Sequence, residues 1–330
     1  MGEPLDTGQV DHILQRVGGL AGGMALWLAA DGATPLATYA YQADTVFPLA
    51  SSFKLFVLQA LFEQVAEGRL SLDEEIPTTR AAASLGDRKP ALSPLRRLAQ
   101  MMIYNSGNTA SDVLFKRVGL DAPQRLIARL GLAHTRVVLP TREYYVIIAG
   151  LDPAFPPEDL VGATARFAAR SPAAQAAAIA AVAERAAALA PREIERATEP
   201  FYAFERYTRG QTYQILDQLD NVSTPREMVR LMHFLYRGGD LPPALASEME
   251  FMLARGDGRR DVGCFRGRIS RWGGKGGDDL GQASMCGYAV APDGRVLVYS
   301  FLSSRLHDDY RGATRLCQAL GTLYNILNPP

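Results

Sequence analysis

This chain of 330 residues has no net charge, and it contains few lysines, cysteines and histidines. Its 35 basic side chains balance 35 acidic ones, and no long basic stripe is present, which argues against a nucleic acid as a partner. No run approaches the roughly 18 apolar residues that a membrane span needs. The four histidines are scattered, so a zinc cluster is not expected.

The three cysteines, Cys264, Cys286 and Cys317, lack the spacing of a metal site, and their odd number argues against a disulfide framework. The first residues, Met1-Gly2-Glu3-Pro4, lack the basic and apolar segments of a signal peptide. Both observations favour a cytoplasmic protein. The alternative is an exported protein whose signal has been removed.

The composition, 48% apolar and 21% charged, is sufficient to bury a core, and the length corresponds to two domains or to one domain with an insertion. Only four of the basic residues are lysine: Lys54, Lys89, Lys116 and Lys275. Arginine keeps its proton in proteins, so chemistry that needs a neutral amine requires lysine. Lys89 and Lys116 are interpreted as ordinary surface residues, whereas Lys54 and Lys275 fall within sequence motifs.

Hydrophobic periodicity and turn residues predict strands near both ends of the chain and helices around them. The predicted strands cover residues 24–29, 36–41, 283–291 and 295–303, with turns at 31–32 and 292–294. The predicted helices cover residues 8–19, 47–65, 95–118 (one helix or two), 124–130, 223–236 and 310–326. Residues 161–190 contain 16 alanines, which predicts one long helix or a helical pair, or alternatively a mobile linker.

These elements predict an α+β fold in which an antiparallel sheet is flanked by helices. The strands at the two ends of the chain most simply share one sheet. We therefore expect a sheet domain made of residues 1–50 and 241–330, and a helical domain of residues 51–240 inserted between them. The Ala-rich segment would belong to an extended insertion within residues 144–222.

The segment Ser51-Ser52-Phe53-Lys54 places a serine at the start of a predicted helix and a lysine about one turn later on the same face. Apolar residues surround this helix on every side, which indicates burial. An unpaired buried ammonium is unfavourable, so Lys54 is expected to be neutral or paired. Ser51 beside such an amine would be an activated nucleophile. The alternative is a capping serine followed by a surface lysine.

Two further motifs are ambiguous by themselves. The stretch Tyr104-Asn105-Ser106-Gly107-Asn108 is typical of a polar turn between helices. The stretch Trp272-Gly273-Gly274-Lys275-Gly276-Gly277 is either a flexible loop or a strand that a ligand or another backbone approaches closely. Together with the first motif they form the ordered series Ser-x-x-Lys, Ser-x-Asn and Lys-x-Gly.

This series resembles the signature of serine β-lactamases and penicillin-binding proteins, and most closely that of class A β-lactamases. The resemblance covers most of the chain and implies a class A β-lactamase-like fold with an extra Ala-rich helical insertion. The chain is also similar to the β-lactamase-like serine hydrolase found in clavulanic acid gene clusters. The resemblance implies no metal and no organic cofactor, and its partner would be a small-molecule substrate: a β-lactam, a peptide or an ester.

The resemblance also implies roles for the residues of the first two motifs. Ser51 would be the acylated nucleophile and Lys54 its proton acceptor. Ser106 would relay protons to the leaving group, and Asn108 would hold an amide carbonyl of the substrate.

The third motif departs from the family pattern. By resemblance, Lys275 would add positive charge near the leaving group or a substrate carboxylate, and the N–H groups of Ser51 and Asp278 would form the oxyanion hole beside Gly277. Gly276 replaces a Thr or Ser that helps to bind the substrate carboxylate. Asp278 and Asp279 should repel an anionic substrate unless they point away or pair with a cation.

Deacylation in class A enzymes needs a glutamate that activates water, and the resemblance points to Glu143. The family pattern Glu-x-x-x-Asn is missing after it, and about 80 residues separate Glu143 from Ser223, more than a class A Ω-loop holds. The insertion could therefore reshape the pocket or leave Glu143 in a structural ion pair with Arg142.

The predicted function is a β-lactamase-like serine hydrolase that forms an acyl-enzyme on Ser51 and then hydrolyses it. Its substrates would be β-lactams or related amides or esters. The altered third motif and the uncertain deacylation base keep three alternatives open: a penicillin-binding acceptor or sensor that stays acylated, a DD-peptidase or esterase, and a catalytically silent scaffold.

Overall fold

The computed structural model describes residues 6–79, 82–85, 91–256 and 259–329. The chain forms two units. Residues Met1–Ser52 and Val222–Pro330 make up the first, called the sheet unit, and residues Phe53–Asn221 make up the second, called the helical unit. The mixture of helices with an antiparallel sheet confirms the predicted α+β class.

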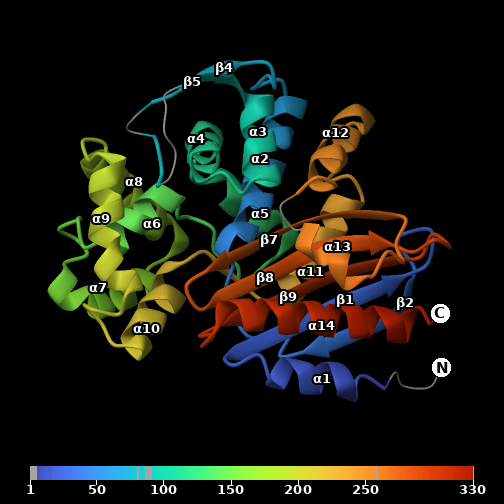
Figure 1. Cartoon of the computed structure of the whole chain (residues 1–330). Coiled ribbons are helices and arrows are strands. Elements are labelled where there is room, and N and C mark those ends of the chain that lie inside the picture. Colours follow the sequence, from blue (N-terminus) through green and yellow to red (C-terminus); the bar gives the residue numbers. More distant parts are fainter. Residues whose placement is uncertain (1–5, 80–81, 86–90, 257–258, 330) are drawn as a thin grey trace. The chain divides into compact units, whose positions relative to one another are not determined.

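The sheet unit is built on five antiparallel strands in the order β2-β1-β9-β8-β7 (Figure 1). The strands are β1 (Leu20–Leu28), β2 (Pro35–Tyr41), β7 (Arg271–Asp279), β8 (Gln282–Val290) and β9 (Val296–Ser304). Both predicted hairpins are present. The turn between β8 and β9 contains Gly294 with φ +88°, a conformation that glycine adopts without steric cost. Strands from the two ends of the chain thus pair in one sheet, as β1 with β9.

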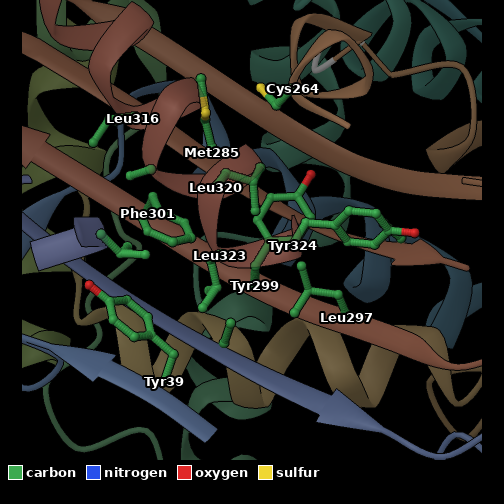
Figure 2. Close-up of a cluster of buried hydrophobic side chains, with 14 of the residues drawn as sticks. Tyr39, Cys264, Met285, Leu297, Tyr299, Phe301, Leu316, Leu320, Leu323 and Tyr324 are labelled. Carbon is green, nitrogen blue, oxygen red and sulfur yellow. The ribbon is translucent and has the colours of Figure 1, made fainter. Parts of the chain in front are cut away.

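One face of the sheet is covered by α1 (Gly8–Gln15), α13 (Arg259–Cys264) and α14 (Asp309–Leu327). Figure 2 shows side chains of β9 such as Phe301 and Leu297 gathered with Leu320, Leu323 and Tyr324. A polar chain runs through this core: the Trp272 indole N–H donates to Tyr299 Oη at 2.7 Å, and the Tyr299 hydroxyl donates to Asp261 at 2.9 Å. Hydrogen bonding of these buried polar groups removes the penalty of burying them.

The opposite face is covered by α11 (Pro225–Tyr236), which contacts β1, β8 and β9, while α12 (Pro243–Leu253) contacts β7. Helix α11 begins as predicted, since Thr224 Oγ1 accepts the N–H of Glu227 at 3.2 Å and Pro225 occupies the first turn. The predicted boundary at residue 240 assigned α11 to the helical domain. The structure places α11 in the sheet unit because its apolar stripe of Met228, Leu231, Met232 and Leu235 is buried there.

Cys264 and Cys317 form a disulfide that joins α13 to α14, with Cα atoms 5.2 Å apart. The expectation that the cysteines form no disulfide is therefore wrong. The two residues are 53 positions apart, and no spacing pattern in a set of three cysteines identifies such a pair. The remaining thiol, Cys286, is free and buried in β8.

The helical unit begins at the end of the short 3₁₀ helix η1 (Ala50–Phe53). Its helices are α2 (Lys54–Ala66), α3 (Leu95–Tyr104), α4 (Asn108–Val118), α5 (Ala122–Leu130), α6 (Thr141–Ile148), α7 (Leu160–Ala168), α8 (Pro172–Ala186), α9 (Pro191–Tyr202) and α10 (Arg209–Leu219). It also contains η2 (Pro157–Asp159) and the two-stranded ribbon of β4 (Glu75–Thr78) and β5 (Ala91–Pro94). In the sheet unit, β3 (Phe47–Pro48) pairs with β6 (Val222–Ser223), so the predicted helix over 47–65 starts only at Ala50.

The Ala-rich segment is a helical pair, α7 and α8, rather than a linker. The break between them coincides with Ser171-Pro172, where Ser171 Oγ accepts the N–H of Ala174 and proline occupies the first turn of α8. Helix α6 contacts both α8 and α9, so the insertion packs against the segment that carries Glu143. In the part of the chain that is described, no helix is long and apolar enough to cross a membrane.

Candidate active site

Ser51 lies in η1, which runs directly into α2, so Ser51 and Lys54 are separated by about one helical turn. Ala50, the residue before Ser51, has a φ of +44°. A non-glycine residue in this region is strained, and such strain persists where the surrounding structure holds it. The Ser51 side chain therefore emerges from a backbone bend that the fold imposes.

Strand β7 passes close to the backbone of Ser51 at Gly277. A Cβ atom built on Gly277 would lie 2.3 Å from Ser51 N and 3.0 Å from Ser51 Cα. Both distances are shorter than van der Waals contact, so only glycine fits at this position. The close approach places the amide-bearing backbone of β7 beside the Ser51 amide, the arrangement that an oxyanion hole requires.

Two buried hydroxyl groups that the sequence motifs did not identify tie the Ser51 segment to β7 and β8. The Oγ atoms of Ser52 and Ser284 lie 2.7 Å apart. Ser52 Oγ is also 3.0 Å from the carbonyl oxygen of Lys275, and Ser284 Oγ is 3.0 Å from that of Leu49. Each hydroxyl has a single proton, and either arrangement of the protons links η1 to the sheet.

Lys275 is fully buried in β7, and its ammonium donates to the carbonyl oxygen of Gly276. Its cross-strand neighbour is Cys286, whose thiol has a pKa raised to about 12 by burial. At neutral pH this thiol is protonated and is no nucleophile. Lys275 thus places a buried amine within β7, beside the strand segment that approaches Ser51.

Carboxylates gather where β7 turns into β8. Asp278 is exposed, and Asp279 Oδ1 accepts the N–H of Leu280 at 2.8 Å. Asp309 accepts the N–H of Gly281 at 2.9 Å, and its pKa is raised by partial burial and by the charges of Asp279, Asp308 and Asp278. This end of β7 is therefore locally negative, as the sequence predicted from the two aspartates.

Lys54 is fully buried in the first turn of α2. Its Nζ donates to the carbonyl oxygen of Ser106 at 2.7 Å, to Ser106 Oγ at 3.2 Å and to Asn108 Oδ1 at 2.8 Å. Ser106 has a φ of +55°, a second strained non-glycine residue within a motif. The structure thus brings Lys54, Ser106 and Asn108 together, and the polar turn at 104–108 encloses the amine.

Glu143 lies in the first turn of α6 and is fully buried. Its Oε1 accepts a hydrogen bond from Lys116 Nζ at 2.7 Å. Lys116 lies at the surface as interpreted, but its ammonium pairs with this buried carboxylate, which the sequence did not predict. Its partner lies 27 positions away in the sequence. Lys89 lies outside the described residues.

The alternative in which Arg142 pairs with Glu143 is also wrong. The Arg142 guanidinium donates to three carbonyl oxygens, those of Ala83, Ala186 and Leu189. Ala186 is the last residue of α8 and Leu189 lies three residues after it, so Arg142 connects the end of this Ala-rich helix to α6.

Asp112 of α4 holds the start of α6. Its two carboxylate oxygens accept the backbone N–H groups of Thr141 at 2.7 Å and Arg142 at 2.8 Å. Burial and the neighbouring charge of Glu143 raise the pKa of Asp112 to about 7, while Lys116 and the two N–H groups oppose the rise. Sequence reasoning missed Asp112, although its position four residues after Asn108 on the same helix face is a usable signal.

Comparison with known proteins identifies the family. The model of the β-lactamase enzyme family matches residues 9–327. The chain belongs to this β-lactamase family. The prediction of a β-lactamase-like serine hydrolase of the penicillin-binding superfamily is thereby confirmed at the level of the family.

Among sequence relatives of this β-lactamase family member, the extended-spectrum β-lactamase PER-1 of Pseudomonas aeruginosa is 29% identical over 126 residues. That alignment covers 35% of this chain and 40% of PER-1. Among solved structures, a β-lactamase from Sphaerobacter thermophilus superposes with a TM-score of 0.69 at 19% identity, over 98% of this chain and 97% of that one.

The penicillin-G acyl-enzyme of a PBP-A variant superposes with a TM-score of 0.66, also at 19% identity, over 98% of this chain and 96% of that one. A variant of a reconstructed class A β-lactamase ancestor of Gram-negative bacteria superposes with a TM-score of 0.63 at 16% identity, over 97% of each chain. The predicted class A β-lactamase-like fold is confirmed by these superpositions.

Proposed function

We propose that this member of the β-lactamase family is an acyl-enzyme serine hydrolase with Ser51 as nucleophile, acting on β-lactams or on related amides or esters. One observation carries the proposal: the fully buried amine of Lys54, one helical turn after Ser51, is enclosed by three neutral oxygen atoms of Ser106 and Asn108. Burial disfavours the charged form of an amine, and an amine one turn from a serine hydroxyl can act as its base.

In the proposed acylation, Lys54 Nζ accepts the proton of the Ser51 hydroxyl as Oγ forms a bond to the substrate carbonyl carbon. The negative charge moves to the carbonyl oxygen, which the N–H groups of Ser51 and Asp278 stabilise. As the carbon–nitrogen or carbon–oxygen bond breaks, Lys54 returns a proton through Ser106 Oγ to the leaving group. The 3.2 Å contact between Lys54 Nζ and Ser106 Oγ supports this relay. The product is an ester of Ser51.

In the proposed deacylation, Glu143 takes a proton from a water molecule whose oxygen attacks the ester carbonyl. The bond from that carbon to Ser51 Oγ then breaks, and Oγ regains the proton that Glu143 took from water, so that both groups return to their starting states. Asn108 would orient an amide of the substrate. Lys275 would face its anionic group. Asp278 and Asp279 would disfavour substrates with a second carboxylate.

The second candidate function is a penicillin-binding acceptor that stays acylated. It is favoured by Ile147, four residues after Glu143, because the family pattern Glu-x-x-x-Asn has an amide at this position and this chain has an apolar side chain. The acyl-enzyme named for the PBP-A variant supports penicillin as the first acylating agent to be tested.

Intact-mass spectrometry after mixing with penicillin G or a cephalosporin tests the proposal. We expect a mass increase equal to the β-lactam in the wild-type protein and in Ser247→Ala, a control at an exposed position of α12. Ser51→Ala should show no adduct. A transient adduct with accumulating product identifies the hydrolase, and a persistent adduct identifies the acceptor. An adduct that survives Ser51→Ala contradicts the proposed nucleophile.

For the compartment, we propose the exported alternative, because disulfides such as Cys264–Cys317 persist in oxidising environments. Alkylation of cell fractions with a mass-tagged thiol reagent tests this. One reactive thiol per unfolded chain, found outside the cytoplasm, is the expected result, and three reactive thiols in the cytoplasm contradict it.

A further inference from the structure

We propose that Lys116 is a positioning residue for deacylation. It holds Oε1 of Glu143 and keeps the carboxylate charged, so that Oε2 is the oxygen that takes the proton from water. This inference rests on the proposed function, and it identifies Lys116 as the cation that stabilises the charged form of the proposed base, Glu143.

The two oxygens of Glu143 have different surroundings. Oε1 accepts a hydrogen bond from Lys116 Nζ at 2.7 Å. Oε2 is buried and has no hydrogen-bond partner among the residues that the structure describes. Buried carboxylate oxygens are normally hydrogen-bonded, and an exception calls for an explanation. A water molecule that donates to Oε2 supplies the missing hydrogen bond and is the donor that general-base catalysis requires.

Glu143 lies near a second buried acid, Asp112, so a nearby cation is needed to stabilise its negative charge. Asp112, on α4, is completely buried, and its charge and that of Glu143 repel each other. Lys116, on the same helix, faces both carboxylates. The third charged group, Arg142 of α6, has its guanidinium engaged by three carbonyl oxygens. Among the residues that the structure describes, Lys116 is thus the cation that forms an ion pair with one of these two acids, Glu143.

A buried carboxylate that loses its countercharge beside another acid is favoured in its neutral form. A protonated Glu143 cannot accept a proton from water, so deacylation would stop while acylation by Ser51 and Lys54 continued. In this step water loses one proton to Oε2 and its oxygen forms the bond to the acyl carbon. The bond from that carbon to Ser51 Oγ breaks, and Oγ receives the proton from Glu143. Lys116 stays charged and exchanges no proton.

The test compares Lys116→Met with Lys116→Arg and with a matched control, Arg117→Met. Arg117 follows Lys116 on α4, its side chain is 37% exposed against 33% for Lys116, and it pairs with a different carboxylate, Glu74, at 2.8 Å. Acylation and deacylation rates are measured separately by quenched-flow mass spectrometry with penicillin G between pH 5 and 9, after circular dichroism has verified folding.

We expect Lys116→Met to slow deacylation at pH 7 by about 10–100-fold and to leave acylation within about threefold. The acidic limb of the deacylation profile should move to higher pH by about one unit or more, because an opposite charge at this range shifts a carboxyl by roughly 1–3 units. Lys116→Arg should restore the profile, and Arg117→Met should not change it. A Lys116→Met profile with the wild-type limb overturns the inference.

A second measurement is independent of turnover. The side-chain carboxyl of Glu143, ¹³C-labelled and assigned with Glu143→Gln, is titrated by NMR in the free protein. The Glu143 resonance should titrate at higher pH in Lys116→Met than in the wild-type protein or in Arg117→Met. An unchanged titration contradicts the role of Lys116 even if no β-lactam acylates the protein, an outcome that would instead defeat the proposed function.

Discussion

Gly277→Ala should abolish most of the acylation activity without removing any functional group. The added Cβ would lie 2.3 Å from Ser51 N, 3.0 Å from Ser51 Cα and 3.1 Å from Ala50 Cβ. Carbon and nitrogen atoms in contact are about 3.5–4 Å apart, so the two backbones must separate by about 1 Å. Neither side yields easily. Gly277 lies within the β7–β8 ladder opposite Ser284, and η1 is tied to the sheet through Ser52.

The displacement falls on the proposed oxyanion hole. Loss of one oxyanion donor costs about 10²–10³-fold in rate, or roughly 3–4 kcal/mol of transition-state stabilisation, and a misplacement of 1 Å costs about 10²-fold. We therefore expect the second-order acylation rate constant to fall by about 10²–10³-fold. The overpacking should also lower the free energy of unfolding by about 1–3 kcal/mol.

Stopped-flow measurement of acylation with a chromogenic cephalosporin provides the assay, and thermal unfolding verifies that the variant is folded. Gly210→Ala is the matched control, because a Cβ at that position of α10 meets no atom within 4 Å. The control should acylate at the wild-type rate. If Gly277→Ala acylated within about threefold of wild type, the position of the oxyanion hole beside β7 would be refuted.

Three further predictions concern stability and positioning. Ser52→Ala should lower the free energy of unfolding by about 1 kcal/mol and slow acylation, because it removes the buried hydroxyl between η1 and β7. Denaturant titration measures the change in stability, and an unchanged acylation rate would contradict the prediction. Reduction of Cys264–Cys317, which closes a loop of 53 residues, should cost about 2–4 kcal/mol, and unfolding curves with and without dithiothreitol should differ accordingly. Burial raises the pKa of Asp112 from its ordinary value of 3.8 to about 7 in the folded chain, so the native state binds more protons between these pH values. The unfolding free energy of wild type minus that of Asp112→Asn should therefore fall as pH rises from about 4 to about 7, and a pH-independent difference would contradict the assignment.

The order of the three motifs sufficed to predict the family and the class of fold. Ser51 and Lys54 are three residues apart, so their relation is set by the helix that contains both. The hairpins at Asp31-Gly32 and at 292–294 and the helical pair in the Ala-rich segment are likewise local features. Local backbone preference and hydrophobic periodicity are properties of neighbouring residues, and the sequence displays them directly.

The sequence did not predict helix α6, because its residues have little local preference for a helix. Helix α6 contains Tyr144-Tyr145-Val146-Ile147, aromatic and β-branched residues that do not favour a helix. Asp112 supplies acceptors for the first two N–H groups of α6 from another helix. Tertiary contacts thus override the local preference of this segment.

The sequence alone determined which residue types are available for the chemistry: a serine and a lysine one turn apart, a Ser-x-Asn turn and a glycine-flanked lysine. Only the tertiary structure decided how several of them are used. It paired Lys116 with Glu143 across 27 positions, joined Cys264 to Cys317, and brought the Ser52 and Ser284 hydroxyls within hydrogen-bond distance. Such pairings depend on side chains that the fold brings together from distant positions, and neither periodicity nor motif spacing encodes them.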